Sequence, residues 1–254
     1  MTEMTEQNPH IAALIELHRG LDRLGPGDEA FSRRILAGLP ALPDRPRIAD
    51  LGCGTGAGAL LLAEWLDAPV RAVDLSSVFL ADLEARAQVR GLAHLITTVE
   101  ADIGQLEWPA GCLDLLWSEG AAYNLGFARA LRTWGPLLAP GGIAVISELS
   151  WFTEDAPAPV RAYWQEAYPE IGSEAENMAR AIDAGLEVLG VARLPTEAWW
   201  DNYYGPLRRR MAALGQHADP VMQEVIAETA LEMSMLREYG DAYGYSFYLL
   251  RSSG

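Results

Sequence analysis

Three glycines alternate with other residues directly after a short apolar run. Ile48–Leu51 reads as a buried strand, Gly52–Gly56 as a tight turn and Ala59–Leu66 as the helix that follows. This order is typical of a nucleotide-type site, because glycine lets the backbone bend sharply and lets a ligand approach it, while the helix N-terminus offers free N–H groups. The residues of this turn predicted to bind a ligand are Asp50, Gly52, Cys53, Gly54, Thr55 and Gly56.

The position of one acid helps to distinguish between nucleotides. Gly52-x-Gly54-x-x-Ala57 satisfies the loose dinucleotide fingerprint, which alone is a weak signal. Asp50, however, stands two residues before the first glycine, and Asp50-x-Gly52-x-Gly54-x-Gly56 resembles motif I of the class I S-adenosylmethionine-dependent methyltransferases. In that family the turn faces the methionine part of the cofactor, whose ammonium gives a carboxylate a role. The alternative is that Asp50 only braces the loop.

Two later acids end predicted strands. Asp74 closes the apolar segment Val70–Ser76, and an aspartate at the end of a second strand can accept both ribose hydroxyls. The alternative is an N-cap for the helix Val78–Arg90. After the third predicted strand, Leu95–Val99, the resemblance implies that Asp102 binds the adenine amino group, unless it is an ordinary loop aspartate. The resemblance also implies cofactor contacts for the residues that follow these acids, Leu75 and Ile103.

The fourth predicted strand, within Gly111–Gly120, ends in polar residues. Ligands bind at the carboxyl ends of open parallel sheets. We therefore expect this end to lie near the reacting methyl group, with Ser118 and Glu119 beside the cofactor and with Tyr123 and Asn124 on the substrate side. Leu137–Gly142, a Pro-Gly-Gly turn into a fifth strand at Ile143–Glu148, is another frequent feature of the family.

Strand and helix patterns alternate five times between about residues 45 and 150, which predicts an α/β fold with a doubly wound, mostly parallel sheet. Ser173–Ala184 reads as a helix with a Ser173–Glu176 capping box, and Leu186–Leu194 as a sixth strand. Alternating residues around Tyr245–Leu250 read as a last strand, and the resemblance implies that it is the family's seventh, antiparallel between the fifth and sixth. We expect a single domain, 1–254, with an N-terminal cover (1–44), a cofactor-binding core (45–150) and remaining strands (151–254) that carry inserts at 151–170 and 195–243.

The predicted N-terminal cover consists of two helices, about residues 10–22 and 28–39, separated by Gly25-Pro26-Gly27. In such enzymes this region often covers the cofactor or substrate, so we expect Gly25 to contact the cofactor. Simple packing on the sheet is the alternative. The second insert carries a helix at Pro220–Tyr239 and the basic triplet Arg208–Arg210, which is expected to be a solvated helix face, with an anion site as the alternative.

The composition indicates which kinds of partner the protein is not expected to bind. The 254 residues carry a net charge of −16 with a sequence pI near 4.6, and such a surface repels phosphate backbones, so a nucleic-acid partner is not expected. The two cysteines and four scattered histidines suggest no disulfide framework and no metal site. The N-terminus has no basic apolar leader, and no run approaches the roughly 20 apolar residues of a membrane span. We expect a cytoplasmic protein without a membrane partner.

The resemblance covers roughly residues 45–250. A closer similarity, to a subgroup of small bacterial methyltransferases, rests on Trp117–Phe127, Ser150–Thr153, Ala167–Ile171 and the aromatic C-terminus. It implies methylation of a small molecule by in-line displacement at the sulfonium, without naming the acceptor or the oligomeric state. Most of the rate would come from aligning the reactants and excluding water.

An amine or hydroxyl acceptor also needs a base. Glu119 is the first candidate, although it can also contact the cofactor or form a structural hydrogen bond. His18 is the second, against the alternative of a packed helix histidine. Together with the acidic balance, aromatic side chains would suit a cationic or aromatic acceptor, unless they are core. The predicted substrate-side aromatic residues are Trp151, Trp200, Tyr203 and Tyr204, in addition to Tyr123.

Two rival functions are considered. An NAD-dependent oxidoreductase is disfavoured because the chain has no lysine and so lacks the usual Tyr-x-x-x-Lys pair. A domain that binds S-adenosylmethionine as a sensor, without turnover, fits the motifs as well. The polar end of the fourth strand and the large inserts favour catalysis.

Overall fold

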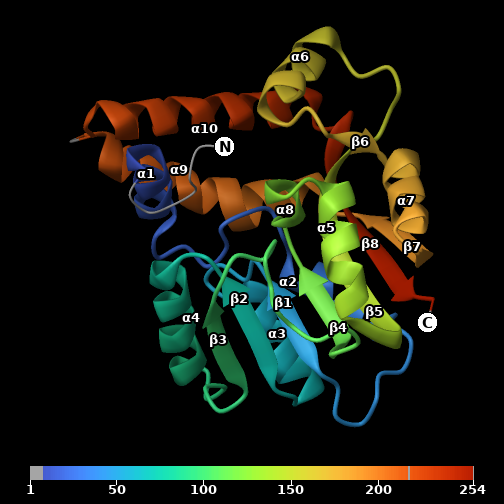
Figure 1. Ribbon diagram of the computed structural model, residues 1–254. Helices are drawn as coiled ribbons and strands as arrows, with labels where there is room; N and C mark the ends of the chain where they lie inside the picture. Colours follow the sequence, from blue (N-terminus) through green and yellow to red (C-terminus); the bar gives the residue numbers. More distant parts are fainter. Residues whose placement is uncertain (1–7, 217, 254) are drawn as a thin grey trace.

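The computed structural model describes residues 8–216 and 218–253. The N-terminal segment for which the sequence predicts no leader lies outside them up to Gln7. Figure 1 shows a central sheet whose strands follow the order β3-β2-β1-β4-β5-β8-β7. The strands of this path are β1 Ile48–Leu51, β2 Val70–Asp74, β3 Ile96–Glu100, β4 Leu113–Ser118, β5 Leu138–Trp151, β7 Leu186–Arg193 and β8 Tyr243–Ser252.

Strands β1 to β5 pair in parallel, and β8 runs antiparallel between β5 and β7. A further two-residue strand, β6 (Gly172–Ser173), pairs with the end of β5. The predicted doubly wound, mostly parallel α/β sheet with its antiparallel last strand is therefore confirmed. The carboxyl ends of β1, β2 and β4 meet at one edge, where this topology places ligands.

Both faces of the sheet are covered. From Leu115 onward the residues of β4 alternate between two cores, with Leu115 and Trp117 in one and Leu116 in the other. The first core is closed by α2 Glu29–Ala37, α3 Ala57–Leu66 and α4 Ser77–Val89. The second is closed by α5 Phe127–Trp134 and α7 Glu174–Asp183, which begins with the predicted capping box.

A helical layer lies over the carboxyl edge of the sheet (Figure 1). Here α1 contacts both α9 and α10, so the N-terminal helix packs on the second insert. The elements of this layer are α1 Pro9–His18, α6 Ala158–Ala167, α8 Thr196–Trp199, the π-helical turn η3 Trp200–Tyr204, α9 Gly205–Gly215 and α10 Pro220–Tyr239. The short turns η1 (Ala122–Asn124) and η2 (Gly135–Leu137) complete the described elements. None of the helices described is both long and apolar enough to cross a membrane.

Some boundaries differ from those predicted. The Pro-Gly-Gly segment is not a turn before the fifth strand, because β5 already begins at Leu138 and continues through Gly141, whose φ is +74°. At its other end β5 runs on to Trp151, since β8 pairs with it from Ile143 to Trp151. The first helix ends at His18, earlier than the predicted residue 22, and a loop of residues 19–28 leads to α2.

Candidate active site

The glycine-rich turn joins β1 to α3. Gly52, Gly54 and Gly56 have φ of +73°, +51° and +86°, a region that strains other residues. A Cβ on Gly52 would lie 2.2 Å from the Cβ of Ala121, so the close approach of β4 also requires glycine there. The turn is fixed because the N–H groups of Gly52 and Cys53 both donate to the Val73 carbonyl, at 2.8 and 2.9 Å.

Asp74, at the end of β2, accepts hydrogen bonds from the backbone N–H of Gly54 at 2.8 Å and of Ser76 at 2.9 Å. Burial raises the pKa of this carboxyl, and these N–H donors oppose the rise. Asp74 therefore joins the glycine turn to the end of the neighbouring strand. Its carboxylate lies on the wall of a cavity.

Asp50 is buried, with 2% of its surface exposed, and lies on the wall of the same cavity. Burial first, and then the nearby charge of Glu119, raises the pKa of Asp50 well above its usual value. The space around it is tight, since a Cβ on Gly58 would lie 2.8 Å from an Asp50 oxygen. A cation bound in the cavity would relieve this repulsion between carboxylates.

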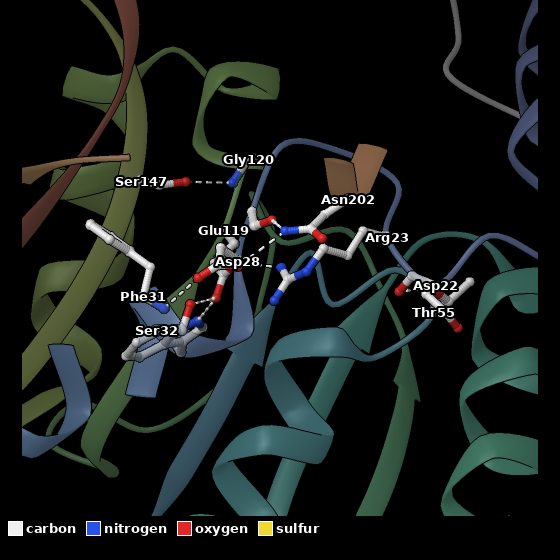
Figure 2. Close-up of polar contacts among 12 residues, drawn as sticks. Asp22, Arg23, Asp28, Phe31, Ser32, Thr55, Glu119, Gly120, Ser147 and Asn202 are labelled. Carbon is white, nitrogen blue, oxygen red and sulfur yellow. Dashed lines mark hydrogen bonds and ion pairs between the residues drawn. The ribbon is translucent and has the colours of Figure 1, made fainter. Parts of the chain in front are cut away.

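Glu119, just after β4, is held by three donors of the protein (Figure 2). Arg23 forms an ion pair with Oε2 at 2.8 Å, and both side chains are about nine-tenths buried. Ser32 Oγ and Trp117 Nε1 both donate to Oε1, at 2.9 Å. Since both oxygens already accept hydrogen bonds, the geometry favours an anchoring role for Glu119 over the role of a base.

The loop between α1 and α2 lies against the glycine turn. The Thr55 hydroxyl contacts the carbonyls of Leu21 and Asp22, at 3.1 and 3.2 Å. Arg86 donates to the Asp22 carbonyl at 3.0 Å and to the Thr55 carbonyl at 2.7 Å. Asn202 fastens the far end of the loop by donating to the Gly27 carbonyl at 3.0 Å. The N-terminal loop is thus attached both to the turn and to the second insert.

These elements enclose the glycine-turn cavity, about 400 Å³ in volume, between the carboxyl edge of the sheet and the helical layer. Cavities of this size are typical of small-ligand sites. The predicted residues that line it are Gly25, Asp50, Gly52, Cys53, Gly54, Thr55, Asp74, Glu119, Tyr123, Asn124, Tyr203 and His18. Nearly all of the predicted turn is therefore brought together with the candidate base His18.

A second cavity, the aromatic chamber, adjoins the first and has a volume of about 250 Å³. It shares part of its wall with the glycine-turn cavity, namely Leu24, Gly25, Pro26, Gly120, Tyr123, Tyr203 and Glu232. The rest of its wall is mainly aromatic and consists of Leu149, Tyr163, Trp164, Ala167, Tyr168, Trp199 and Tyr245.

His18 and Tyr203 meet at the junction of the two cavities. The Nδ1 of His18 lies 2.8 Å from the Leu14 carbonyl, and its Nε2 lies 3.0 Å from the Tyr203 hydroxyl. Because a carbonyl can only accept, Nδ1 carries the proton, and in a neutral ring Nε2 then accepts from the tyrosine. Burial lowers the pKa of His18, which favours this neutral ring.

Several predicted cofactor residues do not line either cavity. Ser118 is fully buried, and its hydroxyl donates to the Leu51 carbonyl at 2.8 Å, so it joins β4 to β1 and offers no surface to a ligand. Asp102 accepts hydrogen bonds from the Gly104 N–H and the Gln105 side chain, which brace its own loop.

The remaining predicted cofactor residues outside the cavity walls are apolar or glycine. Ile103 is buried near Gly52, while Leu75 is half exposed beyond Asp74. Gly56 is outside both walls but forms the N-cap of α3.

Three predicted substrate-side aromatics also lie elsewhere, because they pack on other side chains. Trp151 stacks edge-on against Tyr243 and beneath Arg161. Trp200 is covered by Arg237, whereas its neighbour Trp199 lines the aromatic chamber. Tyr204 is fully buried, and its hydroxyl donates to Glu232 at 2.5 Å. Tyr204 therefore positions Glu232, which lines the walls of both cavities.

Sequence reasoning missed Arg23 and most of the aromatic chamber. Glu232 has a readable signal, since Val225, Thr229, Glu232 and Leu236 share one face of α10, and this face is turned inward. A carboxylate on such a face needs a partner or a function. The other missed residues come from three distant parts of the chain and show no common pattern: Tyr163 and Trp164 in α6 with Tyr168 just after it, Trp199 in α8 and Tyr245 in β8.

A doubly wound sheet with an antiparallel last strand, together with an Asp-x-Gly-x-Gly-x-Gly turn beside a strand-end acid, defines the class. The fold and the turn are those of the class I S-adenosylmethionine-dependent methyltransferases. Residues 48–142 match a family described as a methyltransferase domain.

Relatives agree with this class. The chain is 27% identical over 224 residues to trans-aconitate 2-methyltransferase of Escherichia coli O1:K1 / APEC, which covers 83% of this chain and 77% of that protein. It is 35% identical over 109 residues, 42% of this chain and 39% of that protein, to dimethylglycine N-methyltransferase of Parasynechococcus marenigrum (strain WH8102). A methyltransferase from Geobacter sulfurreducens, solved with S-adenosylhomocysteine, shares the fold with a TM-score of 0.80, at 21% identity over 94% of this chain and 97% of that one.

Proposed function

We propose that this enzyme transfers a methyl group to a small molecule by in-line displacement, with the cofactor in the glycine-turn cavity and the acceptor in the aromatic chamber. The observation that supports the proposal is the wall that the two cavities share, which includes Gly120, Tyr123 and Tyr203. Two ligands that meet across such a wall can react directly, and alignment of this kind supplies much of the rate in a displacement.

The glycine-turn cavity fits S-adenosylmethionine by its donor and acceptor set. Asp74 would accept the ribose hydroxyls, since its carboxylate is on the wall and is already oriented by two backbone N–H groups. Asp50 would attract the methionine ammonium. Arg23, the one guanidinium among the described residues of this wall, would attract the methionine carboxylate, and its ion pair with Glu119 holds it in place. Asp102 and Ile103 remain a prediction for the adenine side.

When bound, S-adenosylmethionine supplies an electrophilic methyl group on a sulfonium. The protein has to align the acceptor with that group and keep water away from it. The loop of residues 19–28 is suited to this task, because Leu24, Gly25 and Pro26 border both cavities and the loop is fastened by Arg86 and Asn202.

Labelled methyl transfer tests the proposal. The enzyme and methyl-labelled S-adenosylmethionine would be incubated with a panel of small amines, phenols, thiols and quinols, and separately with bulk RNA and bulk protein. We expect label only in the small-molecule samples, together with S-adenosylhomocysteine. Transfer to RNA or protein alone, or tight binding of the cofactor without turnover on any acceptor, would contradict it, and the second result would favour a sensor.

A further inference from the structure

The wall of the aromatic chamber, as far as the structure describes it, carries a negative side chain without a positive one to balance it. Among the described residues that line it there is one carboxylate, Glu232, and there is no arginine, lysine or histidine. Arg23 and His18 lie on the cofactor side, on the wall of the glycine-turn cavity. An anionic acceptor would therefore find no cationic partner in the chamber, while a cationic one would find a carboxylate.

Glu232 is placed to serve as that partner. It projects from α10 into the region where the two cavities join and borders both of them. Its Oε1 accepts a hydrogen bond from Tyr204 at 2.5 Å, whereas its Oε2 accepts none from the residues that the structure describes. Burial raises the pKa of Glu232, with no basic side chain to oppose it, and a bound cation would reverse this rise.

The walls add a second attraction for a cation. Tyr123 and Tyr168 meet edge to face with their centroids 6.2 Å apart, and Trp199 lies 5.2 Å from Tyr245. All four line the chamber. The faces of such rings attract ammonium groups, most strongly where water is excluded.

A path for a proton leads away from the same place. Tyr203 borders both cavities, and its hydroxyl is hydrogen-bonded to the His18 Nε2, which carries no proton. Tyr203 can therefore receive a proton from a ligand while it passes its own to His18. No similar acceptor is available at Glu119, whose oxygens already bind Arg23, Ser32 and Trp117.

We propose that the acceptor is a small amine, bound as its ammonium ion by Glu232 and the surrounding rings and deprotonated through Tyr203 by His18. One N–H proton moves to Tyr203 as the tyrosine proton moves to His18 Nε2, which leaves a neutral amine and an imidazolium. The nitrogen lone pair then forms the new N–C bond, and the electron pair of the S–C bond stays on sulfur. His18 returns its proton to water after product release.

The proposal rests on the proposed function and restricts its acceptor. It sets this enzyme apart from the relative named for trans-aconitate, a polycarboxylate that the chamber offers no cation to bind. We expect no methylation of trans-aconitate.

Recognition can be tested without turnover. Phenyltrimethylammonium has a permanent positive charge and no lone pair, so it binds without reacting. Calorimetry in the presence of S-adenosylhomocysteine should show that it binds the wild-type enzyme and that Glu232→Gln weakens this binding about 10-fold or more, as loss of a buried charge partner does. The matched control is Glu228→Gln, an exposed acid one turn earlier on α10, which should change nothing. Equal affinity in the wild type and Glu232→Gln would overturn the ammonium site.

Proton transfer can be tested with two amines. Benzylamine is protonated at neutral pH, whereas aniline is not. Tyr203→Phe should lower kcat for benzylamine roughly 100-fold with little change in KM, but should barely affect aniline, because only benzylamine must lose a proton first. His18→Gln should have the same effect. The controls His94→Gln, at an exposed histidine, and Tyr239→Phe, at a partly buried tyrosine outside both cavity walls, should resemble the wild type. Equal losses with both amines would overturn the relay.

Different results would contradict the amine proposal and the methyl-transfer proposal. If the enzyme methylates phenols or carboxylates but no amine, the methyl-transfer proposal stands and the amine proposal is overturned. If no small molecule is methylated while S-adenosylhomocysteine still binds, both are overturned.

Discussion

Three carboxylates of the glycine-turn cavity show how environment assigns different roles to the same group. Asp74 is oriented by backbone N–H groups and faces the cavity. Asp50 is buried, and burial together with the charge of Glu119 raises its pKa although Arg23 opposes the rise. Glu119 is neutralised by Arg23 and fixed by two further donors. Their order in the sequence does not reveal these differences, because each depends on neighbours from other elements.

Replacement of Asp74 tests the ribose contact. Asp74→Ala should weaken S-adenosylhomocysteine binding by roughly 1–3 kcal/mol, as loss of charge-assisted hydrogen bonds usually does. Calorimetry would measure the affinity, and the exposed Asp44→Ala would serve as the control. The variant also leaves two N–H groups without their acceptor, so thermal unfolding should be recorded alongside. An unchanged affinity would remove Asp74 from the site.

A double-mutant cycle can measure how much the ion pair between Arg23 and Glu119 contributes to stability. Breaking a buried pair leaves an uncompensated charge, so Glu119→Gln and Arg23→Gln should each lower the free energy of unfolding by roughly 2–4 kcal/mol, and the double variant by less than their sum. Urea unfolding would measure this, with Glu29→Gln, at an exposed pair, as the control. If Glu119→Gln instead lost turnover alone, with stability and cofactor affinity intact, Glu119 would be the base after all.

At the scale of elements, the carboxyl end of β5 contains an acid that the site does not use. Glu148 is only 1% exposed, and neither of its oxygens has a hydrogen-bond partner among the described residues. Burial raises its pKa from 4.5 to about 8. Because the folded chain keeps this proton to higher pH than the unfolded chain does, the contribution of Glu148 to stability is complete below about pH 4.5 and is lost as the pH rises towards about 8.

Glu148→Gln removes this titration. The variant should unfold at nearly the wild-type temperature at acidic pH and at a higher temperature than wild type above the folded pKa of about 8. The shift should be several degrees, since 1 kcal/mol corresponds to about 2–4 °C in a protein of this size. Thermal scans at both pH values, with the exposed Glu154→Gln as control, would measure it. A difference that does not depend on pH would contradict the predicted titration.

For the whole molecule, the glycine-turn cavity lies between the sheet and the helical layer, so a ligand there contacts both. Its walls come from α1, the loop of residues 19–28, the glycine turn and α10. A ligand that binds only the folded chain stabilises it by mass action. Occupation of this cavity should therefore strengthen the attachment of the N-terminal and second-insert helices to the sheet.

Thermal shift assays can test this coupling and the choice of cofactor together. At about 100 times its Kd, S-adenosylhomocysteine should add about 2.7 kcal/mol, which corresponds to a rise in Tm of roughly 5–10 °C. NAD at the same concentration should leave Tm unchanged. A shift with NAD and none with S-adenosylhomocysteine would contradict the assigned class.

Much of the architecture could be predicted because its signals are local. The strand, the alternate glycines and the following helix occupy one continuous segment, Ile48–Leu66, and the Ser173–Glu176 capping box lies within a single turn. Propensity, turn chemistry and periodicity act over such short distances. The boundaries of β5 were less predictable, because its length is set by pairing with β8, which lies far along the chain.

The sequence by itself determined the alternation of strands and helices and the turn that identifies the cofactor class, since each follows from neighbouring residues, whereas the antiparallel last strand was implied by the family resemblance. Only the tertiary structure decided that Trp199 rather than Trp200 faces the aromatic chamber, that Glu119 is already paired, and that Glu232 lines the same cavity as Tyr203 and His18. The physical reason is distance along the chain. The pocket is built from the N-terminal helix, the ends of strands and the last long helix. Which of their side chains meet depends on tertiary packing, and tertiary packing produces no pattern among residues that are neighbours in the sequence.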